Sequence, residues 1–408
     1  MQHNRKIIRR SILVSLALLL AACGVGSRIS RATLSAAAPK SEHQVGFPAE
    51  LYARSIPADN PQTPAKVALG QALFVDPRLS ADKVQRCESC HDYTRGFTDQ
   101  RTTSVGVDNQ IGQRNAPTIL NAMFNTTLFW DGRASSLEEQ AKSPILNPIE
   151  MGMTSSDEVV ARLRAIPAYE ERFRRAFGRE VNFDDIARAL ASYERTQFSF
   201  DSPFDHFIAG DSGAIDESAK RGWLLFTGKA RCVSCHAFSR EHPLFTDDRF
   251  HNTGVSWRAS IANQAAATVT ARDEHQTGRF EHQIDRLAVG TSASELGRFV
   301  VTGRKSDIAA FRTPDLRNLL VTEPYFHDGS APTLWDVVAH FNRGGLRNPF
   351  LDSAIVPLDL SKTDEDDLVD FLATLTSPEY EDAAKVEYQK QFKASRAVLV
   401  ARPTEAMR

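Results

Sequence analysis

The sequence has no excess of charge of either sign. Its 49 basic and 51 acidic residues give a formal net charge of −2 at pH 7. A nucleic-acid-binding protein would instead carry a basic patch or stripe, so this composition gives no support for a nucleic-acid partner. With 42% hydrophobic and 25% charged residues among 408, the chain has the composition of an ordinary globular protein with room for two or three domains.

The sequence also lacks an apolar run long enough for a permanent transmembrane helix. The run over 11–22 is short and follows the basic segment 5–10. A charged segment before a short apolar run is the pattern of an export signal. We therefore expect 1–22 to be a signal peptide and the mature protein to lie in the periplasm.

Cysteines that could form a disulfide are missing. Four of the five cysteines belong to two motifs described below, and the fifth is Cys23 in the run Leu20-Ala21-Ala22-Cys23-Gly24. This run resembles a bacterial lipoprotein cleavage box, so we expect Cys23 to be lipidated and to be the only membrane attachment. The alternative is an ordinary signal peptide cleaved near Ala22.

The four remaining cysteines stand in two five-residue motifs. These are Cys87-Glu88-Ser89-Cys90-His91 and Cys232-Val233-Ser234-Cys235-His236. Two thiols three positions apart can form thioether bonds to a haem, and the histidine directly after them can ligate its iron; this is the c-type haem attachment pattern. A four-cysteine zinc site is the alternative, but it gives no reason for a histidine after each cysteine pair. The sequence therefore predicts two covalently bound c-type haems.

No segment shows a convincing alternation of apolar and polar residues, so the predicted class is mainly α. Apolar residues recur at helical spacing over 64–74, 157–165, 184–196 and 363–375. Pro64 suits a first helical turn, and Asp184 is the expected cap of the third helix.

The second half of the chain repeats the first. Gly70-Gln-Ala-Leu-Phe74 before the first motif is echoed by Gly222-Trp-Leu-Leu-Phe226 before the second. A second set of matches is shifted by 197 positions without a gap: Pro117, Asn121, Phe129, Asp131, Gly132 and Leu137 recur as Pro314, Asn318, Phe326, Asp328, Gly329 and Leu334. This predicts two tandem cytochrome c-like domains, each with one haem.

The expected boundaries follow from this repeat. We expect a flexible tether over 23–46, haem domains over 47–202 and 203–378, and a charged surface extension over 379–408. The segment 201–213 is the expected junction. His91 and Pro117 are 26 positions apart but His236 and Pro314 are 78 apart, so the second domain carries an insertion over about 238–310. Its histidines are expected to be solvated, with metal ligation as the alternative; they are His242, His251, His275 and His282.

Over about 69–375 the sequence resembles the bacterial di-haem cytochrome c peroxidases and the related MauG-like enzymes. The motifs that carry the resemblance, besides the two haem motifs, are Arg114-Asn115-Ala116-Pro117, Phe129-Trp130-Asp131-Gly132-Arg133, Asn147-Pro148-Ile149-Glu150-Met151-Gly152 and Pro324-Tyr325-Phe326-His327-Asp328-Gly329. The resemblance implies two cytochrome c-like domains that face each other, with a calcium ion at their interface.

The resemblance also implies roles for single residues. Glu150 matches the catalytic acid above the first haem, and Trp130 matches the aromatic bridge between the haems. Asn115 and the backbone carbonyls of Thr322 and Pro324 match the calcium ligands. The alternatives are that Glu150 is a capping or surface carboxylate and that Trp130 is only core packing. Pro144 and Gln140 are expected to shape the pocket that contains Glu150.

Two departures from the family pattern stand out. The loop 97–112 contains no histidine, although in the well-studied peroxidases a histidine of this loop caps the resting iron; the first haem is therefore expected to be open or water-bound. Phe341 stands where the peroxidases supply a Met ligand to the second iron and the MauG-like enzymes a Tyr, and Phe cannot ligate iron. His340 is adjacent but about 100° away on a helix, so it is one candidate ligand beside an open site or another donor.

The leading prediction is a di-haem peroxidase that reduces hydrogen peroxide with electrons relayed through the second haem and Trp130 from a small cytochrome c or cupredoxin. The runner-up is a MauG-like oxidase that uses peroxide to modify a residue of a partner protein. A pure electron-transfer cytochrome is a third hypothesis, which the acid and the open iron disfavour.

Overall fold

The computed structural model describes residues 39–258 and 292–400. The predicted signal peptide, Cys23, His275 and His282 lie outside the described residues. None of the helices in the described part is long and apolar enough to cross a membrane.

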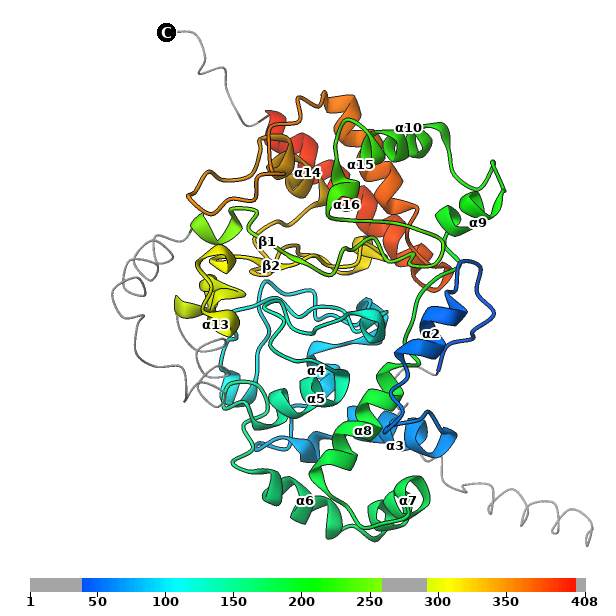
Figure 1. Cartoon of the computed structure of the whole chain (residues 1–408), viewed down its shortest axis with the longest axis vertical. Coiled ribbons are helices and arrows are strands. Elements are labelled where there is room, and N and C mark those ends of the chain that lie inside the picture. The colour runs from blue at the N-terminus through cyan, green and yellow to red at the C-terminus, as the bar shows by residue number, and fades with distance from the viewer. Residues whose placement is uncertain (1–38, 259–291, 401–408) are drawn as a thin grey trace, which may run out of the picture. The chain divides into compact units, whose positions relative to one another are not determined.

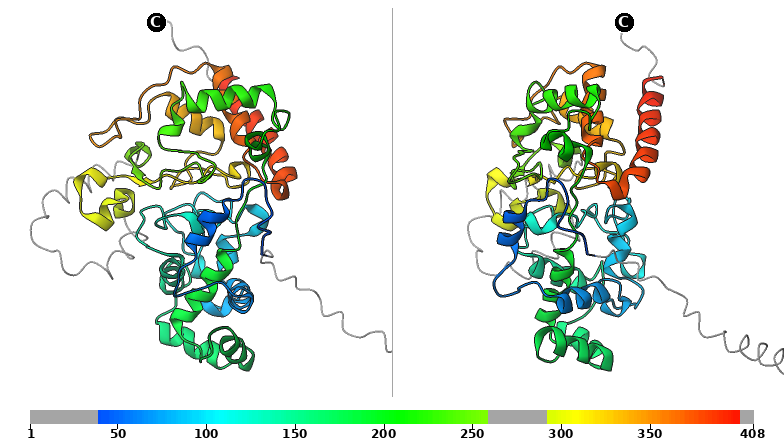
Figure 2. Two further views of the ribbon diagram at one scale, coloured as in Figure 1. Left: turned by 45° about the vertical axis from the view of Figure 1, so that its right-hand side comes forward. Right: turned by 90° about the vertical axis from the view of Figure 1, so that its right-hand side faces the viewer.

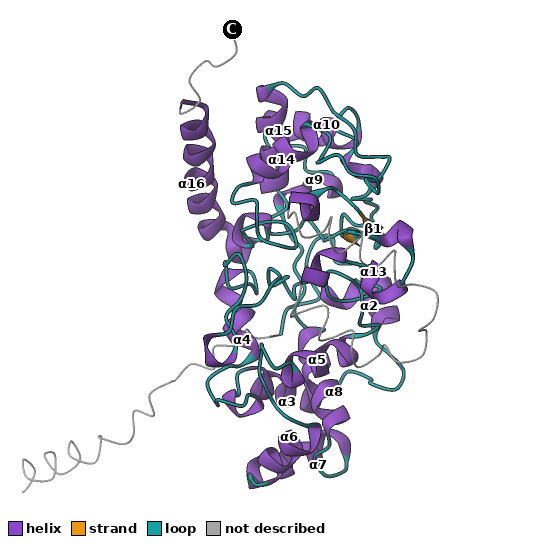
Figure 3. Ribbon diagram, turned by 90° about the vertical axis from the view of Figure 1, so that its left-hand side faces the viewer, coloured by secondary structure: helices purple, strands orange, loops and turns teal. Residues whose placement is uncertain are grey.

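The described chain consists of helices joined by long loops, and its two strands have two residues each (Figure 3). The expected mainly α class is confirmed. The helices are α2 (Ala49–Ser55), α3 (Pro64–Phe74), α4 (Cys87–Cys90), α5 (Leu137–Leu146), α6 (Ser156–Arg164), α7 (Pro167–Phe177), α8 (Phe183–Glu194), α9 (Pro203–Ala209), α10 (Glu217–Thr227), α13 (Phe299–Thr302), α14 (Leu334–Asn342), α15 (Lys362–Ala373) and α16 (Glu381–Val400). The strands β1 (Phe250–His251) and β2 (Phe311–Arg312) pair antiparallel.

The four predicted helices correspond to α3, α6, α8 and α15, but the predicted cap of α8 was wrong. The side chain of Asn182 accepts a hydrogen bond of 2.9 Å from the backbone N–H of Asp185 and is the N-cap. Asp184 lies inside the first turn, where its charge favours the helix N-terminus without capping it.

The same helix crossing occurs twice, which confirms the tandem repeat. Helix α3 packs on α8, and α10 packs on α15 (Figure 1). A Cβ atom on Gly70 would lie 1.9 Å from the carbonyl oxygen of Ala189, and one on Gly222 would lie 1.9 Å from that of Asp367. Only glycine allows the two backbones of each crossing to approach so closely.

The repeat shifted by 197 positions is also reproduced in the backbone. Asn121 and Asn318 both adopt left-handed conformations, with φ of 60° and 59°. Each side-chain oxygen accepts a hydrogen bond of 2.9 Å from a backbone N–H, that of Ser199 for Asn121 and that of Ser377 for Asn318. The chain after each haem motif is therefore held to the end of α8 or α15 in the same way.

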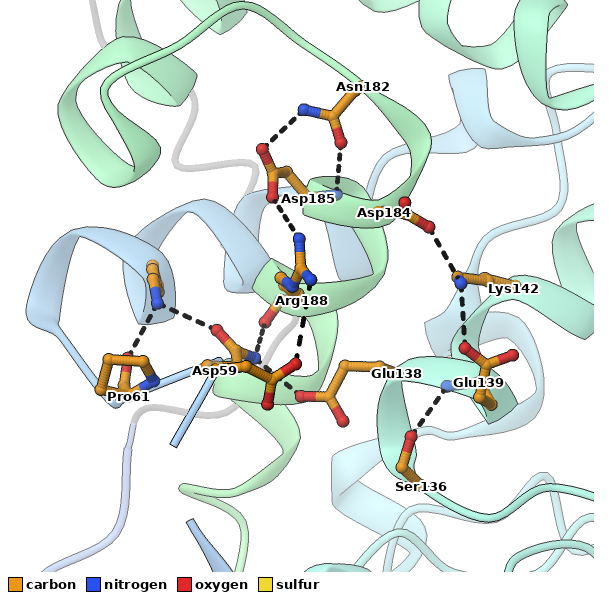
Figure 4. Close-up of polar contacts among 12 residues, drawn as sticks. Asp59, Pro61, Ser136, Glu138, Glu139, Lys142, Asn182, Asp184, Asp185 and Arg188 are labelled. Carbon is orange, nitrogen blue, oxygen red and sulfur yellow. Dashed lines mark hydrogen bonds and ion pairs between the residues drawn. The ribbon is translucent and has the colours of Figure 1, made fainter. Parts of the chain in front are cut away.

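The polar side chains around α8 tie it to α5 (Figure 4). The ammonium of Lys142 lies 3.0 Å from Glu139 on its own helix and 2.9 Å from Asp184 on α8. The carboxylate of Glu138 accepts hydrogen bonds of 2.7 Å from Asn60 and from Arg195. These contacts fix the orientation of α5, whose residues Gln140 and Pro144 line the cavity of the first haem motif.

Both ends of the described chain are more ordered than the sequence predicted. The backbone N–H groups of Lys40 and Phe47 are already hydrogen-bonded, and Val45 accepts a bond of 2.9 Å from Asp201; the tether expected over 23–46 is therefore wrong for 40–46. The charged extension expected over 379–408 contains the long helix α16, most of whose described side chains are exposed (Figure 2). Gln391 of α16 is buried and accepts a hydrogen bond of 2.8 Å from the backbone N–H of Leu334.

The expected junction over 201–213 is not purely a loop, because it contains α9. Phe204 of this helix is fully buried and packs edge-on against Phe371 and Trp223, with ring centroids 5.2 and 5.0 Å away. Aromatic residues of the junction are thus part of the core of the second half.

Candidate haem sites

The first haem motif forms the short helix α4 and the residue after it. The backbone N–H of His91 donates to the carbonyl of Cys87 at 3.0 Å, and its ring Nδ1 lies 3.1 Å from the carbonyl oxygen of Phe97. A hydrogen bond at Nδ1 fixes the ring and leaves Nε2 for a metal, as in most metal-binding histidines. Cys87, Cys90 and His91 line one cavity.

The second motif repeats this geometry. The N–H of His236 donates to the carbonyl of Cys232 at 2.8 Å, and its Nδ1 lies 2.8 Å from the carbonyl oxygen of Phe245. Phe245 and its counterpart Phe97 share a left-handed backbone, with φ of 54° and 59°. Cys232, Cys235 and His236 line a second cavity.

The donor sets fit haem and do not fit zinc. The four motif cysteines are free thiols, and within 39–258 and 292–400 no group of three or more His, Cys, Asp or Glu side chains is placed to hold a metal ion. The four-cysteine zinc alternative is therefore wrong. Burial lowers the pKa of both motif imidazoles, which keeps them in the neutral form that binds iron.

Glu150 lies in the first cavity together with the first motif. Its Oε1 accepts a hydrogen bond of 2.9 Å from the side chain of Asn147, and its backbone carbonyl accepts one of 3.0 Å from Val107. Gln140 and Pro144 line the same cavity, as the sequence predicted. A carboxyl group is thus held at the wall of the cavity in which the first haem would bind.

The loop 97–112, which has no histidine, is packed against the Glu150 segment. The side chain of Gln110 donates to the carbonyl of Pro148 at 3.0 Å. Gly106 is so close that a Cβ atom there would lie 1.8 Å from the carbonyl oxygen of Ile149. The loop therefore supports the backbone around the acid.

Trp130 forms a wall of both cavities. Its indole N–H donates to the carbonyl of Asn115 at 2.9 Å. Its repeat partner, His327, lies edge-on to it with ring centroids 6.5 Å apart. Nε2 of His327 lies 3.1 Å from both Ser256 and Glu295, which flank the undescribed part of the insertion.

Asn115, Thr322 and Pro324, the three predicted calcium ligands, are among the residues that line the second cavity. The side-chain N–H of Asn115 donates to the carbonyl of Arg101 at 2.8 Å. That bond fixes the amide so that its oxygen is available to another partner. Amide and carbonyl oxygens are ligands that calcium accepts, so the donor types fit the ion.

Phe341 and His340 occupy different environments. Phe341 lines the second cavity. His340 is buried, and its Nε2 lies 2.9 Å from the carbonyl oxygen of Thr253. In the described geometry the His340 ring is thus held by a backbone carbonyl of the segment before the insertion gap.

His251 of the insertion is not solvated, contrary to expectation. It is half-buried at the second cavity, with Nδ1 2.7 Å from Asp352 and Nε2 3.0 Å from Asp247. Hydrogen bonds to Cys235, Asp352 and Asp247 raise its pKa to about 10 against the effect of burial.

Two charged residues of the cavity walls were missed from the sequence. Glu194 lines the first cavity, and burial raises its pKa to about 8. Its counterpart in the second half, judged from the matched contacts of α8 and α15, is Leu372, which lines the second cavity. Arg312 lines both cavities. The 197-position repeat pairs it with Asn115, and that is the one signal that could have drawn attention to it.

Comparison with known proteins supports the haem assignment. Residues 64–213 match the family model described as di-haem cytochrome c peroxidase. The chain is 40% identical over 321 residues to the methylamine utilization protein MauG of Methylorubrum extorquens, covering 78% of this chain and 80% of that protein. It is 37% identical to the cytochrome c551 peroxidase of Nitrosomonas europaea, covering 79% and 83%.

Solved structures give the same result. A MauG-like protein associated with microbial copper homeostasis is similar with a TM-score of 0.65 and 33% identity, covering 79% of this chain and 92% of that one. The diheme peroxidase BthA from Burkholderia thailandensis is similar with a TM-score of 0.62 and 25% identity, covering 79% and 88%.

Proposed function

Because the chain belongs to the family of di-haem cytochrome c peroxidases and MauG proteins, we propose that it is an exported di-haem enzyme that reduces hydrogen peroxide to water at the His91 haem. The observation that carries the proposal is the position of Glu150 in the cavity lined by the first haem motif. A pure electron carrier needs no acid at such a place.

The bound haem iron supplies the site at which peroxide binds and receives electrons. Glu150 takes a proton from the nearer peroxide oxygen and returns one to the departing oxygen, a task for which a single positioned carboxyl group suffices. Asn147 holds that carboxyl by its 2.9 Å hydrogen bond. Two electrons and two protons convert each peroxide into two water molecules.

Electrons reach the first haem from the His236 haem through Trp130. This role is supported by the contact of the indole with both cavities. The electron donor is a small cytochrome c or cupredoxin, which docks on the second half.

The test is to mix the oxidised protein with peroxide, with and without a reduced small cytochrome c. We expect reaction without prior reduction, because the loop 97–112 has no histidine to cap the first iron, and rapid oxidation of the cytochrome. A protein that stays inert to peroxide until it is reduced would contradict the open site. Indifference of the spectrum under both conditions would support an electron carrier instead.

A MauG-like oxidase is the second candidate, in which peroxide is used to oxidise a residue of a partner protein. The histidine-free loop favours it, whereas Phe341 at the position of the Tyr that the MauG-like enzymes supply does not. In the same assay, it would give a lasting spectral change with peroxide and negligible turnover of the cytochrome.

Calcium and the lipid anchor are further parts of the proposal. Asn115, Thr322 and Pro324 hold one calcium ion, and Cys23 carries the lipid that attaches the periplasmic protein to a membrane. Metal analysis of the purified protein should give one calcium per chain and none in an Asn115→Leu variant. Cys23→Ser should release the protein from the membrane fraction; unchanged calcium or unchanged fractionation would exclude the respective site.

A further inference from the structure

Arg312 of β2 is placed between the two cavities. Among the described residues it is the one charged side chain that lines both, since the rest of the shared wall is neutral. The neutral members are Asn115, Ala116, Pro117, Thr118, Asn125 and Trp130. Arg312 is 8% exposed, and its backbone N–H donates to the carbonyl of Trp130 at 2.9 Å.

The guanidinium of Arg312 has only neutral hydrogen-bond partners. One terminal nitrogen lies 3.0 Å from the amide oxygen of Asn125 and 3.3 Å from the carbonyl oxygen of Thr313. Its Nε is buried and has no partner. Asp248 and Asp315 act on it only at longer range.

Other arginines at the cavities form direct ion pairs with carboxylates, unlike Arg312. Arg114 and Arg133 share the carboxylate of Asp131 at 2.7 and 3.1 Å. Arg317 forms a buried ion pair of 2.8 Å with Asp205. A buried charge is strongly unfavourable without a directly paired counter-ion, and among the described residues no carboxylate forms an ion pair with Arg312. Its site is therefore suited to an anion from outside the polypeptide.

The cofactors of this family supply that anion, because each haem carries two propionate carboxylates. We propose that the guanidinium of Arg312 binds a propionate of each haem and thereby forms an ionic bridge between the two cofactors. A guanidinium is suited to this, because its five N–H donors lie in a planar fork that can serve two carboxylates at once. The free Nε provides one of the required donors.

Such a bridge affects both irons. A positive charge beside each haem stabilises its reduced form, and removing the charge favours the oxidised form. In Arg312→Gln we expect the reduction equilibrium of both haems to shift roughly tenfold toward the oxidised state, which is 59 mV for a one-electron couple. Arg312→Lys retains the charge and should give a clearly smaller shift.

The experiment is a spectroelectrochemical titration of the holoprotein and its variants, with haem content measured to confirm two haems per chain. Arg249→Gln is the matched control, because it removes the same charge from an exposed residue directly before β1, the strand that pairs with β2. Resonance Raman spectra report the propionate bending modes of both haems independently of any activity.

The bridge is supported if both potentials fall in Arg312→Gln, neither falls in Arg249→Gln, and the propionate modes of both haems change. A fall in only one potential would overturn the shared role. Equal shifts in Arg312→Gln and Arg312→Lys, or none in either, would overturn the electrostatic role. Because none of these measurements uses peroxide, failure of the peroxidase proposal would leave the result unaffected.

Discussion

At the scale of single residues, Glu150 is the side chain on which peroxide reduction depends most directly. Glu150→Gln keeps the size of the side chain and an oxygen for the Asn147 hydrogen bond but removes the transferable proton. We expect peroxide turnover to fall roughly 10²- to 10⁴-fold with two haems still bound. Steady-state turnover with a reduced cytochrome measures the effect, and Glu139→Gln on the exposed side of α5 is the control. Equal turnover in both variants would exclude Glu150 as the acid.

Glu194 should make stability depend on pH. Burial raises its pKa from 4.5 to about 8, so between these values the folded protein holds a proton that the unfolded chain has lost. The free energy of unfolding therefore falls as pH rises from about 5 to about 8 and levels off above. Glu194→Gln removes this contribution, so the difference between variant and wild type should change by on the order of 4 kcal/mol across the window. Urea unfolding at a series of pH values measures it, and parallel curves would refute it.

The role of a single residue could be predicted where the residue stands in a short sequence motif, and not where its role depends on contacts with distant parts of the chain. The haem motifs, Glu150 and Trp130 stand in short motifs that can be recognised without knowing what packs on them. Glu194 and Arg312 could not be recognised, because their burial follows from the packing of α8 on α3 and from the contact of β2 with Trp130. Such contacts join residues more than 100 positions apart, and no local pattern encodes them.

At the scale of elements, the two glycine crossings position the haem domains. Gly70→Ala and Gly222→Ala each place a methyl group 1.9 Å from a backbone carbonyl oxygen of the facing helix. The helices must separate, and overpacking of this kind costs about 1–3 kcal/mol or more. Thermal unfolding should therefore show a lower midpoint for both variants. Gly213→Ala, whose Cβ would meet nothing closer than 3.4 Å, should change it little; three equal midpoints would contradict the role of the crossings.

Element boundaries were predictable where apolar spacing was strong and failed where charged residues dominate. Helices α3 and α15 lie within two residues of their predicted limits. Charged residues occupy much of α16, so its sequence predicts a charged extension without showing that it forms a packed helix. Its buried face consists of few residues, among them Gln391 and the ring of Phe392 that packs 5.8 Å from Trp335. These residues are buried only because α16 packs against α14, so the sequence of α16 alone does not show that it has a buried face.

At the scale of the whole molecule, one buried ion pair fastens the junction helix to the second half. Asp205 of α9 accepts two hydrogen bonds of 2.8 Å from Arg317 and one of 2.8 Å from the Ser202 hydroxyl. Arg317→Leu would leave the Asp205 carboxylate buried without its partner, which typically costs about 3–5 kcal/mol.

The matched control is Arg221→Leu, which breaks a pair with Asp367 that is half exposed on the arginine side and should cost far less. Chemical denaturation of the holoprotein measures the free energy of unfolding of both arginine variants. An Asp205→Asn change added to Arg317→Leu should recover part of the loss, because it removes the unpaired charge. No recovery would show that the arginine acts by packing alone.

The interior position of the four motif thiols has a consequence for biogenesis. Each thiol lines a cavity whose walls come from both halves of the chain, since Asn115 and Trp130 line the second cavity and Arg312 lines the first. We therefore expect each haem to be bonded to its thiols before the two halves pack together. On this expectation, haem attachment takes place on the exported chain before it has folded. In a host that lacks the machinery for c-type haem attachment, we accordingly expect the chain to accumulate without haem. Adding haem after the chain has folded should not restore covalent attachment.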